Sequence, residues 1–212
     1  MFLYFQNDWN DTYTGTFWLV RIKKAKRNNV AIRNGSIKKS IFQVTGNGNT
    51  IVANDALIED TQVVINGLNN TLYISKDVKL RKANIIIRGS NCHVEIGKGT
   101  TFGGVRIINV GVDNKINIGE NCLFSDHIEI WASDTHSIYN EYNEKINKEK
   151  PIKIGDNVWV GSHVIVLKGT EINDGAIIGM GTIVSKNIPK STISVGVPNR
   201  VINENVHWTN EY

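Results

Sequence analysis

The chain has 212 residues, of which 41% are hydrophobic and 21% charged, so it falls in the range of globular rather than disordered proteins. Its 24 Lys and Arg residues against 20 Asp and Glu give a net charge of +4, which is too small to indicate nucleic-acid binding. Two cysteines, Cys92 and Cys122, exclude a disulfide framework and a Cys-rich zinc site. With neither an 18-residue apolar run nor a signal peptide, we expect one cytoplasmic domain without a membrane span.

Residues 1–24 are rich in aromatic side chains, and we expect them to cap the open end of a repeat structure. An added subunit surface or acceptor surface is the alternative. Five cations lie between Arg21 and Arg27, a pattern typical of a solvated stretch; peripheral association with an anionic polymer or membrane surface is the alternative. Seven aromatic residues fall within the first 18 positions: Phe2, Tyr4, Phe5, Trp9, Tyr13, Phe17 and Trp18.

From residue 25 onward the sequence repeats a polar turn followed by a short strand of alternating apolar and polar residues. Segments that start at Gly67, Gly89 and Gly111 align at a spacing of 22 residues. Segments that start at Gly46 and Ala25 join them at a spacing of 21. Each unit therefore predicts a Gly/Asn turn and a strand.

Downstream the period shortens to six residues, which matches neither the α-helix (3.6) nor simple strand alternation (2) and requires a unit of one short strand plus one corner. Three such units make an 18-residue coil, and the 22-residue coil is the same object with about four residues extruded at a corner. The sequence therefore predicts an all-β, triangular parallel β-helix over residues 25–202. The aliphatic positions are Ile154, Val160, Val166, Ile172, Ile178 and Val184, and those four residues later are Val158, Val164, Thr170, Ala176, Thr182 and Ile188.

Residues 131–151 interrupt this register, which runs through Ile118, Phe124 and Ile130 and resumes at Ile154. We expect them to form one loop that leaves the coil, and loops on a rigid scaffold often carry functional sites. The tail, residues 203–212, is polar apart from Trp208 and is expected to pack as a terminal segment.

A family resemblance rests on three segments: Ile154-Gly-Asp-Asn-Val-Trp-Val-Gly-Ser-His-Val-Ile-Val-Leu-Lys-Gly, Ile178-Gly-Met-Gly-Thr-Ile-Val-Ser-Lys and Val195-Gly-Val-Pro-Asn-Arg-Val-Ile. Over roughly residues 90–202 the chain resembles the hexapeptide-repeat acyltransferase superfamily. Ile130-Trp-Ala-Ser-Asp-Thr-His-Ser-Ile-Tyr most resembles the O-acetyltransferases of sialic acid capsules and related surface polysaccharides. The resemblance implies a left-handed β-helix, a homotrimer, acetyl-CoA as co-substrate and a saccharide acceptor. A small acceptor (a simple sugar, a nucleotide-linked amino sugar or an antibiotic) and a non-catalytic binding module are the alternatives.

Three residues are candidates for catalysis. Moving an acetyl group to a sugar hydroxyl requires a base that works near neutral pH, and the resemblance assigns that role to His136. Asp134 could orient the imidazole or only shape a turn. Trp159 stands at an outward hexad position; its indole N–H can donate to a thioester carbonyl or an oxyanion, and the resemblance counts it with the active site. Packing at a subunit interface is the alternative for Trp159.

Coenzyme A is expected along the late coils. Gly161 and Gly179 would allow a pantetheine arm to approach closely, and Lys186 and Arg200 match the positions where the family contacts the coenzyme.

No metal is expected. A zinc site of the kind found in another branch of this fold class needs three convergent histidines, whereas His127, His136 and His163 are separated by 9 and 27 residues with no close pair.

Overall fold

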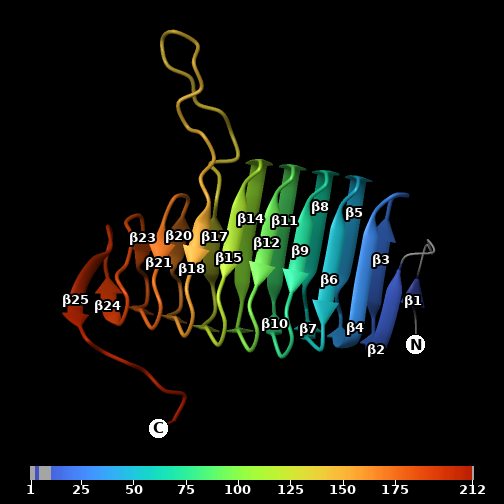
Figure 1. Cartoon of the computed structure of the whole chain (residues 1–212), viewed down its shortest axis with the longest axis horizontal. Helices are drawn as coiled ribbons and strands as arrows, with labels where there is room; N and C mark the ends of the chain where they lie inside the picture. Colours follow the sequence, from blue (N-terminus) through green and yellow to red (C-terminus); the bar gives the residue numbers. More distant parts are fainter. Residues whose placement is uncertain (1–2, 5–10, 212) are drawn as a thin grey trace.

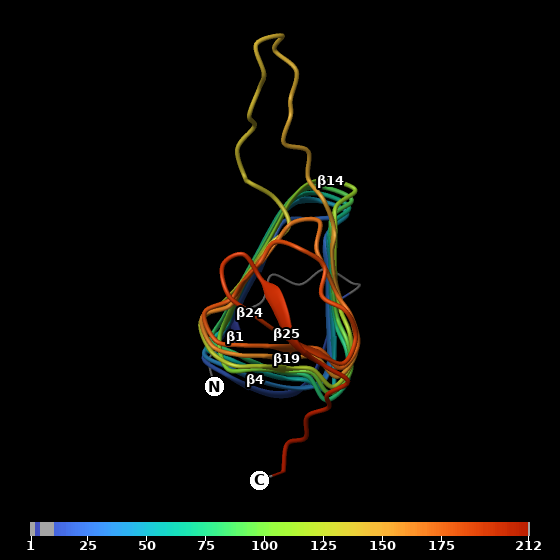
Figure 2. The same ribbon diagram turned by 90° about the vertical axis from the view of Figure 1, so that its left-hand side faces the viewer.

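The computed structural model describes residues 3–4 and 11–211, and its regular elements are all β-strands. The strands stack into a long prism with a triangular cross-section, and the chain runs from one end of the prism to the other (Figures 1 and 2). The prediction of an all-β triangular solenoid is confirmed. Within the described residues, no helix is long and apolar enough to cross a membrane. Phe2, Phe5 and Trp9 of the expected aromatic cap lie outside the described residues.

Face 1 of the prism is a nine-stranded parallel sheet. In spatial order its strands are β1 (Leu3–Tyr4), β3 (Val20–Lys24), β5 (Ile41–Asn47), β8 (Gln62–Leu68), β11 (Ala83–Ser90), β14 (Val105–Val112), β17 (Ile128–Trp131), β20 (Ile165–Leu167) and β23 (Ile183–Val184).

Faces 2 and 3 form one sixteen-stranded sheet, because the long strand β4 (Asn29–Lys38) pairs with face 2 through its first half and with face 3 through its second half. Face 2 continues through β6 (Thr50–Asn54), β9 (Thr71–Ile74), β12 (His93–Ile96), β15 (Lys115–Ile118), β18 (Ile152–Ile154) and β21 (Glu171–Ile172). Face 3 continues through β7 (Leu57–Glu59), β10 (Lys79–Arg81), β13 (Thr101–Phe102), β16 (Leu123–Phe124), β19 (Trp159–Val160), β22 (Ile177–Ile178), β24 (Thr192–Val195) and β25 (Arg200–Glu204). At the N-terminal end β2 (Thr12–Trp18) pairs along β4.

The interior of the prism is a continuous apolar column. Both predicted hexad positions point into it, and all twelve of their residues are buried. Equivalent residues stack directly, as where Ile130 faces Val166 and Val166 faces Val184, and the Phe102 and Phe124 rings stack with centroids 4.5 Å apart. Repeated stacking of one buried position on the next is what a six-residue period requires, so the pattern and the core agree.

The basic run at residues 21–27 is divided between interior and surface. In β3 the side chains alternate inward and outward, and Lys24 points inward, where its ammonium lies 3.1 Å from the carboxylate of Asp11. β3 is already paired with β5 in the stacked register, so regular coils begin inside the segment 1–24.

Glycines line the corner between faces 1 and 2. Gly46, Gly67, Gly89 and Gly111 all have positive φ, and a Cβ on any of the first three would lie against the carbonyl oxygen of the next glycine. Beside them runs a ladder of buried amides, in which Asn49 Oδ1 accepts hydrogen bonds from the main chain and side chain of Asn70 at 2.9 Å. The Gly/Asn turns predicted from the repeat therefore form this corner, and close coil stacking requires the glycine.

Candidate active site

The loop of residues 132–151 leaves the prism at the glycine-lined corner between faces 1 and 2 and projects far beyond it (Figures 1 and 2). It connects β17 to β18 and replaces the short turn found there in earlier coils. At its foot the carbonyl oxygen of Ala132 accepts hydrogen bonds from Asn114 Nδ2 at 2.9 Å and from the Lys150 N–H at 3.4 Å. Further out its two arms pair as a hairpin, with an antiparallel bridge between Tyr139 and Lys145.

His136 lies on the outgoing arm of the loop, and its side chain is exposed. Its main-chain N–H bonds the carbonyl oxygen of Asp134 at 2.7 Å, and its own carbonyl oxygen accepts a hydrogen bond from Asn147 Nδ2 at 2.7 Å. The backbone is thus held from both sides while the imidazole faces solvent, which suits a group that must exchange protons with a bound substrate.

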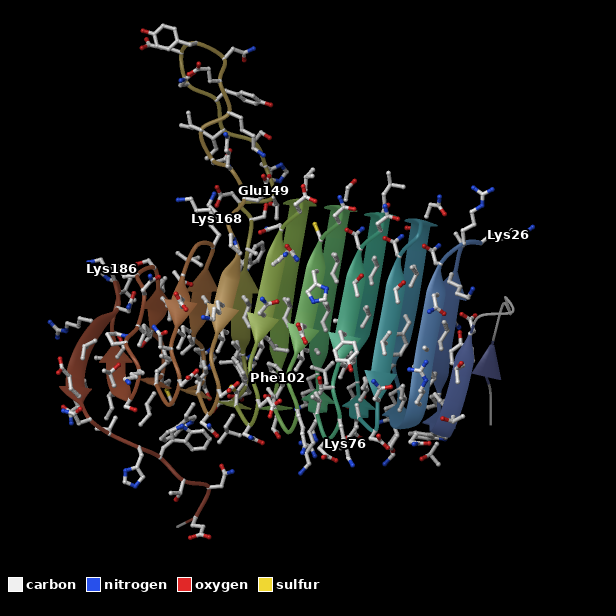
Figure 3. All side chains as sticks on the ribbon, viewed as in Figure 1. Lys26, Lys76, Phe102, Glu149, Lys168 and Lys186 are labelled. Atoms are coloured by element: carbon white, nitrogen blue, oxygen red, sulfur yellow. The ribbon has the colours of Figure 1, made fainter. Side chains whose placement is uncertain are left out.

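The carboxylate of Asp134 binds two groups other than an imidazole. Lys168 Nζ lies 2.5 Å from Asp134 Oδ2, and Asn147 Nδ2 donates to the same oxygen at 2.8 Å. The hydrogen bond from Lys168 is the main reason that the pKa of Asp134 is lowered from its usual value. The turn itself is closed by Ser133, whose hydroxyl accepts the N–H of Thr135 at 3.0 Å. Figure 3 shows Lys168 at the foot of the loop, beside Glu149.

Trp159 lies in β19 on face 3 and points outward, with 39% of its surface exposed. Its register neighbours on the adjacent strands are Leu123 and Ile177. The C-terminal tail turns back along the prism to reach it: the Trp208 ring is tilted against Trp159 with centroids 6.1 Å apart, and Trp208 Nε1 donates to the carbonyl oxygen of Asn157 at 2.6 Å.

The structure stacks Gly161 and Gly179 in neighbouring coils of face 3. A Cβ on Gly161 would come within 2.8 Å of the Met180 nitrogen, and one on Gly179 within 2.6 Å of the Val195 side chain. Coil stacking alone therefore favours glycine at both positions, independent of any coenzyme.

Lys186 and Arg200 come together in the last coil, and both side chains are exposed. Asn199 joins their segments: its Oδ1 accepts the Lys186 N–H at 3.0 Å, and its Nδ2 donates to the Lys186 carbonyl oxygen at 3.1 Å. Lys186 follows β23 at the same corner as the loop, one coil beyond Lys168, and lies near the C-terminal end of the prism in Figure 3. Two cations at this end are chemically suited to phosphate groups.

Within one chain the two principal candidates do not meet. The loop that carries His136 projects from the corner between faces 1 and 2, whereas β19, which carries Trp159, lies on the face opposite that corner (Figure 2). A site that uses both residues therefore requires a second copy of the chain.

The expectation that no two histidines lie close together is wrong for His127 and His163. Their rings stack with centroids 4.7 Å apart and planes only 7° from parallel. The two residues occupy equivalent corner positions, both with positive φ, in coils that the loop separates by 36 residues in sequence. The inserted loop lengthens the sequence separation of the two histidines, so their spacing did not reveal that they stack in adjacent coils. The pair borders a cleft of about 640 Å³ that also contains Lys82, Arg106 and Glu129.

Outside the repeats, sequence reasoning missed two side chains that contact the candidate residues, Asn147 and Trp208. Neither belongs to a repeat, so no spacing signal marks them. Trp208 stood out only as an aromatic in a polar tail, and Asn147 is one of several polar residues in the loop.

Comparisons with known proteins agree with this architecture. A family model described as bacterial transferase hexapeptide (six repeats) matches residues 151–186. The crystal structure of the polySia specific acetyltransferase NeuO aligns with a TM-score of 0.84 at 28% identity, over 91% of this chain and 90% of that chain. The polysialic acid O-acetyltransferase OatWY aligns with a TM-score of 0.77 at 27% identity, over 93% and 91%.

Among curated sequences, the galactoside O-acetyltransferase of Escherichia coli (strain K12) is 54% identical over 54 residues. That match covers 26% of this chain and 27% of the relative, so the chain spans about a quarter of the length of the curated protein that it matches. Residues 151–186 therefore match the hexapeptide-repeat model, and along about nine tenths of its length the chain has the fold of two solved polysialic acid O-acetyltransferases.

Proposed function

We propose that the protein is an acetyl-CoA-dependent O-acetyltransferase whose acceptor is a hydroxyl group of a sialic acid-containing or other surface polysaccharide. The observation that carries this proposal is the likeness to two polysialic acid O-acetyltransferases along nearly the whole of both chains. The loop with its exposed histidine supports it, because a solenoid that served only as a scaffold would need no such loop. A small galactoside acceptor is the second candidate, favoured by the local identity to the galactoside O-acetyltransferase.

His136 serves as the general base in the proposed reaction. The imidazole takes the proton of the acceptor hydroxyl as its oxygen attacks the acetyl thioester carbonyl, and it returns that proton to the departing thiolate of coenzyme A. A carbon–oxygen bond forms and a carbon–sulfur bond breaks, so no oxidant and no metal is required. The indole N–H of Trp159 is the proposed donor to the thioester oxygen, on which negative charge develops.

Donor binding begins beside Trp159 on face 3 in this proposal. Gly161 and Gly179 lack side chains that would obstruct it there, and Lys186, at the corner between faces 1 and 2, with Arg200 supplies positive charge at the C-terminal end for the phosphates of coenzyme A. Because His136 and Trp159 lie at opposite sides of one prism, we propose that the site forms between subunits of a homotrimer. Exposed apolar side chains on the loop, including Ile138, Tyr142 and Ile146, suit contact with a neighbouring subunit.

The test is acetyl transfer by the purified protein from acetyl-CoA to a panel of acceptors: oligosialic acid, neutral capsular oligosaccharides and simple galactosides. Released coenzyme A and base-labile acetyl esters on the acceptor are measured together. We expect turnover with oligosialic acid that is about two to four orders of magnitude lower in the His136→Ala variant. Turnover with galactosides alone would favour the small acceptor over the polymeric one. Absence of turnover with every acceptor in the panel would count against the proposed acetyltransferase activity.

A further inference from the structure

One side chain joins the two arms of the loop beside His136. Asn147 Nδ2 donates to Asp134 Oδ2 at 2.8 Å and to the carbonyl oxygen of His136 at 2.7 Å, while Asn147 Oδ1 accepts the N–H of Ile138 at 2.7 Å. The nitrogen meets two acceptors and the oxygen meets a donor, so the orientation of the amide follows from its partners. These bonds hold the backbone at and after His136 and the side chain of Asp134 before it.

A second side chain ties this arrangement to the β-helix. Lys168 follows β20, in the coil next to the foot of the loop, and its ammonium lies 2.5 Å from Asp134 Oδ2. The same ammonium donates to the carbonyl oxygens of Lys148 at 3.2 Å and Asn147 at 3.4 Å. A continuous chain of polar contacts thus runs from Lys168 through Asp134 and Asn147 to the main chain of His136.

We propose that Asn147 and Lys168 are positioning residues for His136, which hold the exposed histidine at a fixed place relative to the solenoid. This inference rests on the proposed acetyl transfer. An exposed hairpin without such ties would carry the imidazole through a range of positions, and a displacement of about 1 Å from the reacting atoms can cost about 100-fold in rate. The contacts reach the backbone of His136 and not its ring, so they act on the place of the imidazole.

The first test compares Asn147→Ala with Asn140→Ala. Asn140 is a matched control, because its side chain also closes a turn of the loop, bonding the main chain and carboxylate of Glu144 and the N–H of Tyr142, but it has no bond to His136. We expect Asn147→Ala to lower kcat by about 10–100-fold, with KM for acetyl-CoA and the midpoint of the pH–rate profile unchanged. Asn140→Ala should stay within about twofold of wild type. Equal losses in the two variants, or a changed pH midpoint, would overturn the proposal.

Lys168 is tested by Lys168→Met and Lys168→Arg. Methionine keeps the length of the stem without the charge, whereas arginine keeps donors for Asp134. We expect Lys168→Met to lower kcat by about tenfold and Lys168→Arg to restore part of it, with KM for acetyl-CoA unchanged in both. A raised KM for acetyl-CoA would instead place Lys168 among the residues that bind the coenzyme.

Amide hydrogen exchange separates this inference from the proposed function. In Asn147→Ala, exchange across residues 134–138 should be about tenfold faster than in wild type, and that of the β-helix unchanged. If exchange in the loop is faster in Asn147→Ala but the wild-type protein acetylates none of the acceptors, the positioning contacts of Asn147 are supported and the proposed acetyl transfer is refuted. If amide exchange across residues 134–138 is unchanged in Asn147→Ala, the positioning role of Asn147 is refuted, whatever the activity of the protein.

Discussion

The side chain of His136 combines a fixed backbone with a solvent-facing ring, and this defines the first prediction. His136→Ala should lower turnover by about two to four orders of magnitude, the range of a general-base contribution, while the fold stays intact. Steady-state rates and a thermal unfolding curve of the variant check both points. A variant that turns over at nearly the wild-type rate would remove His136 from the mechanism.

Lys186 and Arg200 belong to the last coil, where Asn199 joins their segments, and Lys186 occupies the corner position one coil beyond Lys168. Lys186→Ala and Arg200→Ala should weaken binding of coenzyme A more than binding of pantetheine, because only the former carries the phosphates that a cation would contact. Calorimetric titration of each variant with coenzyme A, its dephospho form and pantetheine measures the difference. Lys115→Ala, on the exposed surface of face 2, is the control and should bind all three ligands like wild type. Equal losses for all three ligands would argue against a phosphate contact.

At the scale of elements, the foot of the loop is held by ion pairs between carboxylates and lysines, so its stability depends on pH. Hydrogen bonds from Lys168 and Lys145 hold the pKa values of Asp134 and Glu149 below their usual 3.8 and 4.5. Because these pKa values are lowered on folding, the stabilisation is complete above the usual values and is lost as the pH falls through the lowered ones.

The prediction is that the loop foot stays closed from pH 7 to about 5 and loosens below about 4. Carboxyl carbon resonances followed by NMR should show Asp134 titrating below 3.8 in the wild type and returning toward it in Lys168→Met. A titration of Asp134 that is identical in the two proteins would show that Lys168 does not set it.

The corner between faces 1 and 2 depends on its glycines. Gly89→Ala should lower the free energy of unfolding by about 2–5 kcal/mol, because the methyl group meets the backbone of Gly111 and the left-handed φ adds its own cost. Gly181→Ala shares the positive φ but has open space around the site, so it should cost only about 1–2 kcal/mol. Denaturant unfolding of the two variants measures the difference. Similar losses would mean that backbone conformation, and not coil contact, is what the corner requires.

The architecture could be predicted from the sequence because it is periodic. Each buried residue such as Val160 or Val166 repeats the environment of its neighbour, so one correct unit gives all the others. The loop foot has no such repetition, and the partners of Asp134 come from residues 13 and 34 positions away in sequence. The contact between Trp208 and Trp159 spans 49 positions and belongs to a tail that follows the last coil. Aperiodic contacts of this kind leave no spacing pattern to detect.

At the scale of the whole molecule, the proposed trimer would use the loop that projects from one corner of the triangular prism. Tyr142, which is 76% exposed, and the exposed residues Ile138 and Ile146 belong to the loop, which extends away from the prism that carries it (Figure 1). A neighbouring prism would cover them and bring its own β19 toward the incoming histidine. Three copies about a three-fold axis would repeat this contact with no free edge left to grow.

The last prediction is that two inactive variants restore activity when mixed. In the proposed trimer each site takes His136 from one subunit and Trp159 from the next, so His136→Ala and Trp159→Ala homotrimers contain only defective sites. After unfolding and refolding together, mixed trimers contain some sites in which both residues are intact, and turnover should return to a substantial fraction of wild type. Refolding each variant alone is the control. Light scattering that shows a fully active monomer would refute the shared site, and so would a refolded mixture, shown to contain mixed trimers, that stays as inactive as its components.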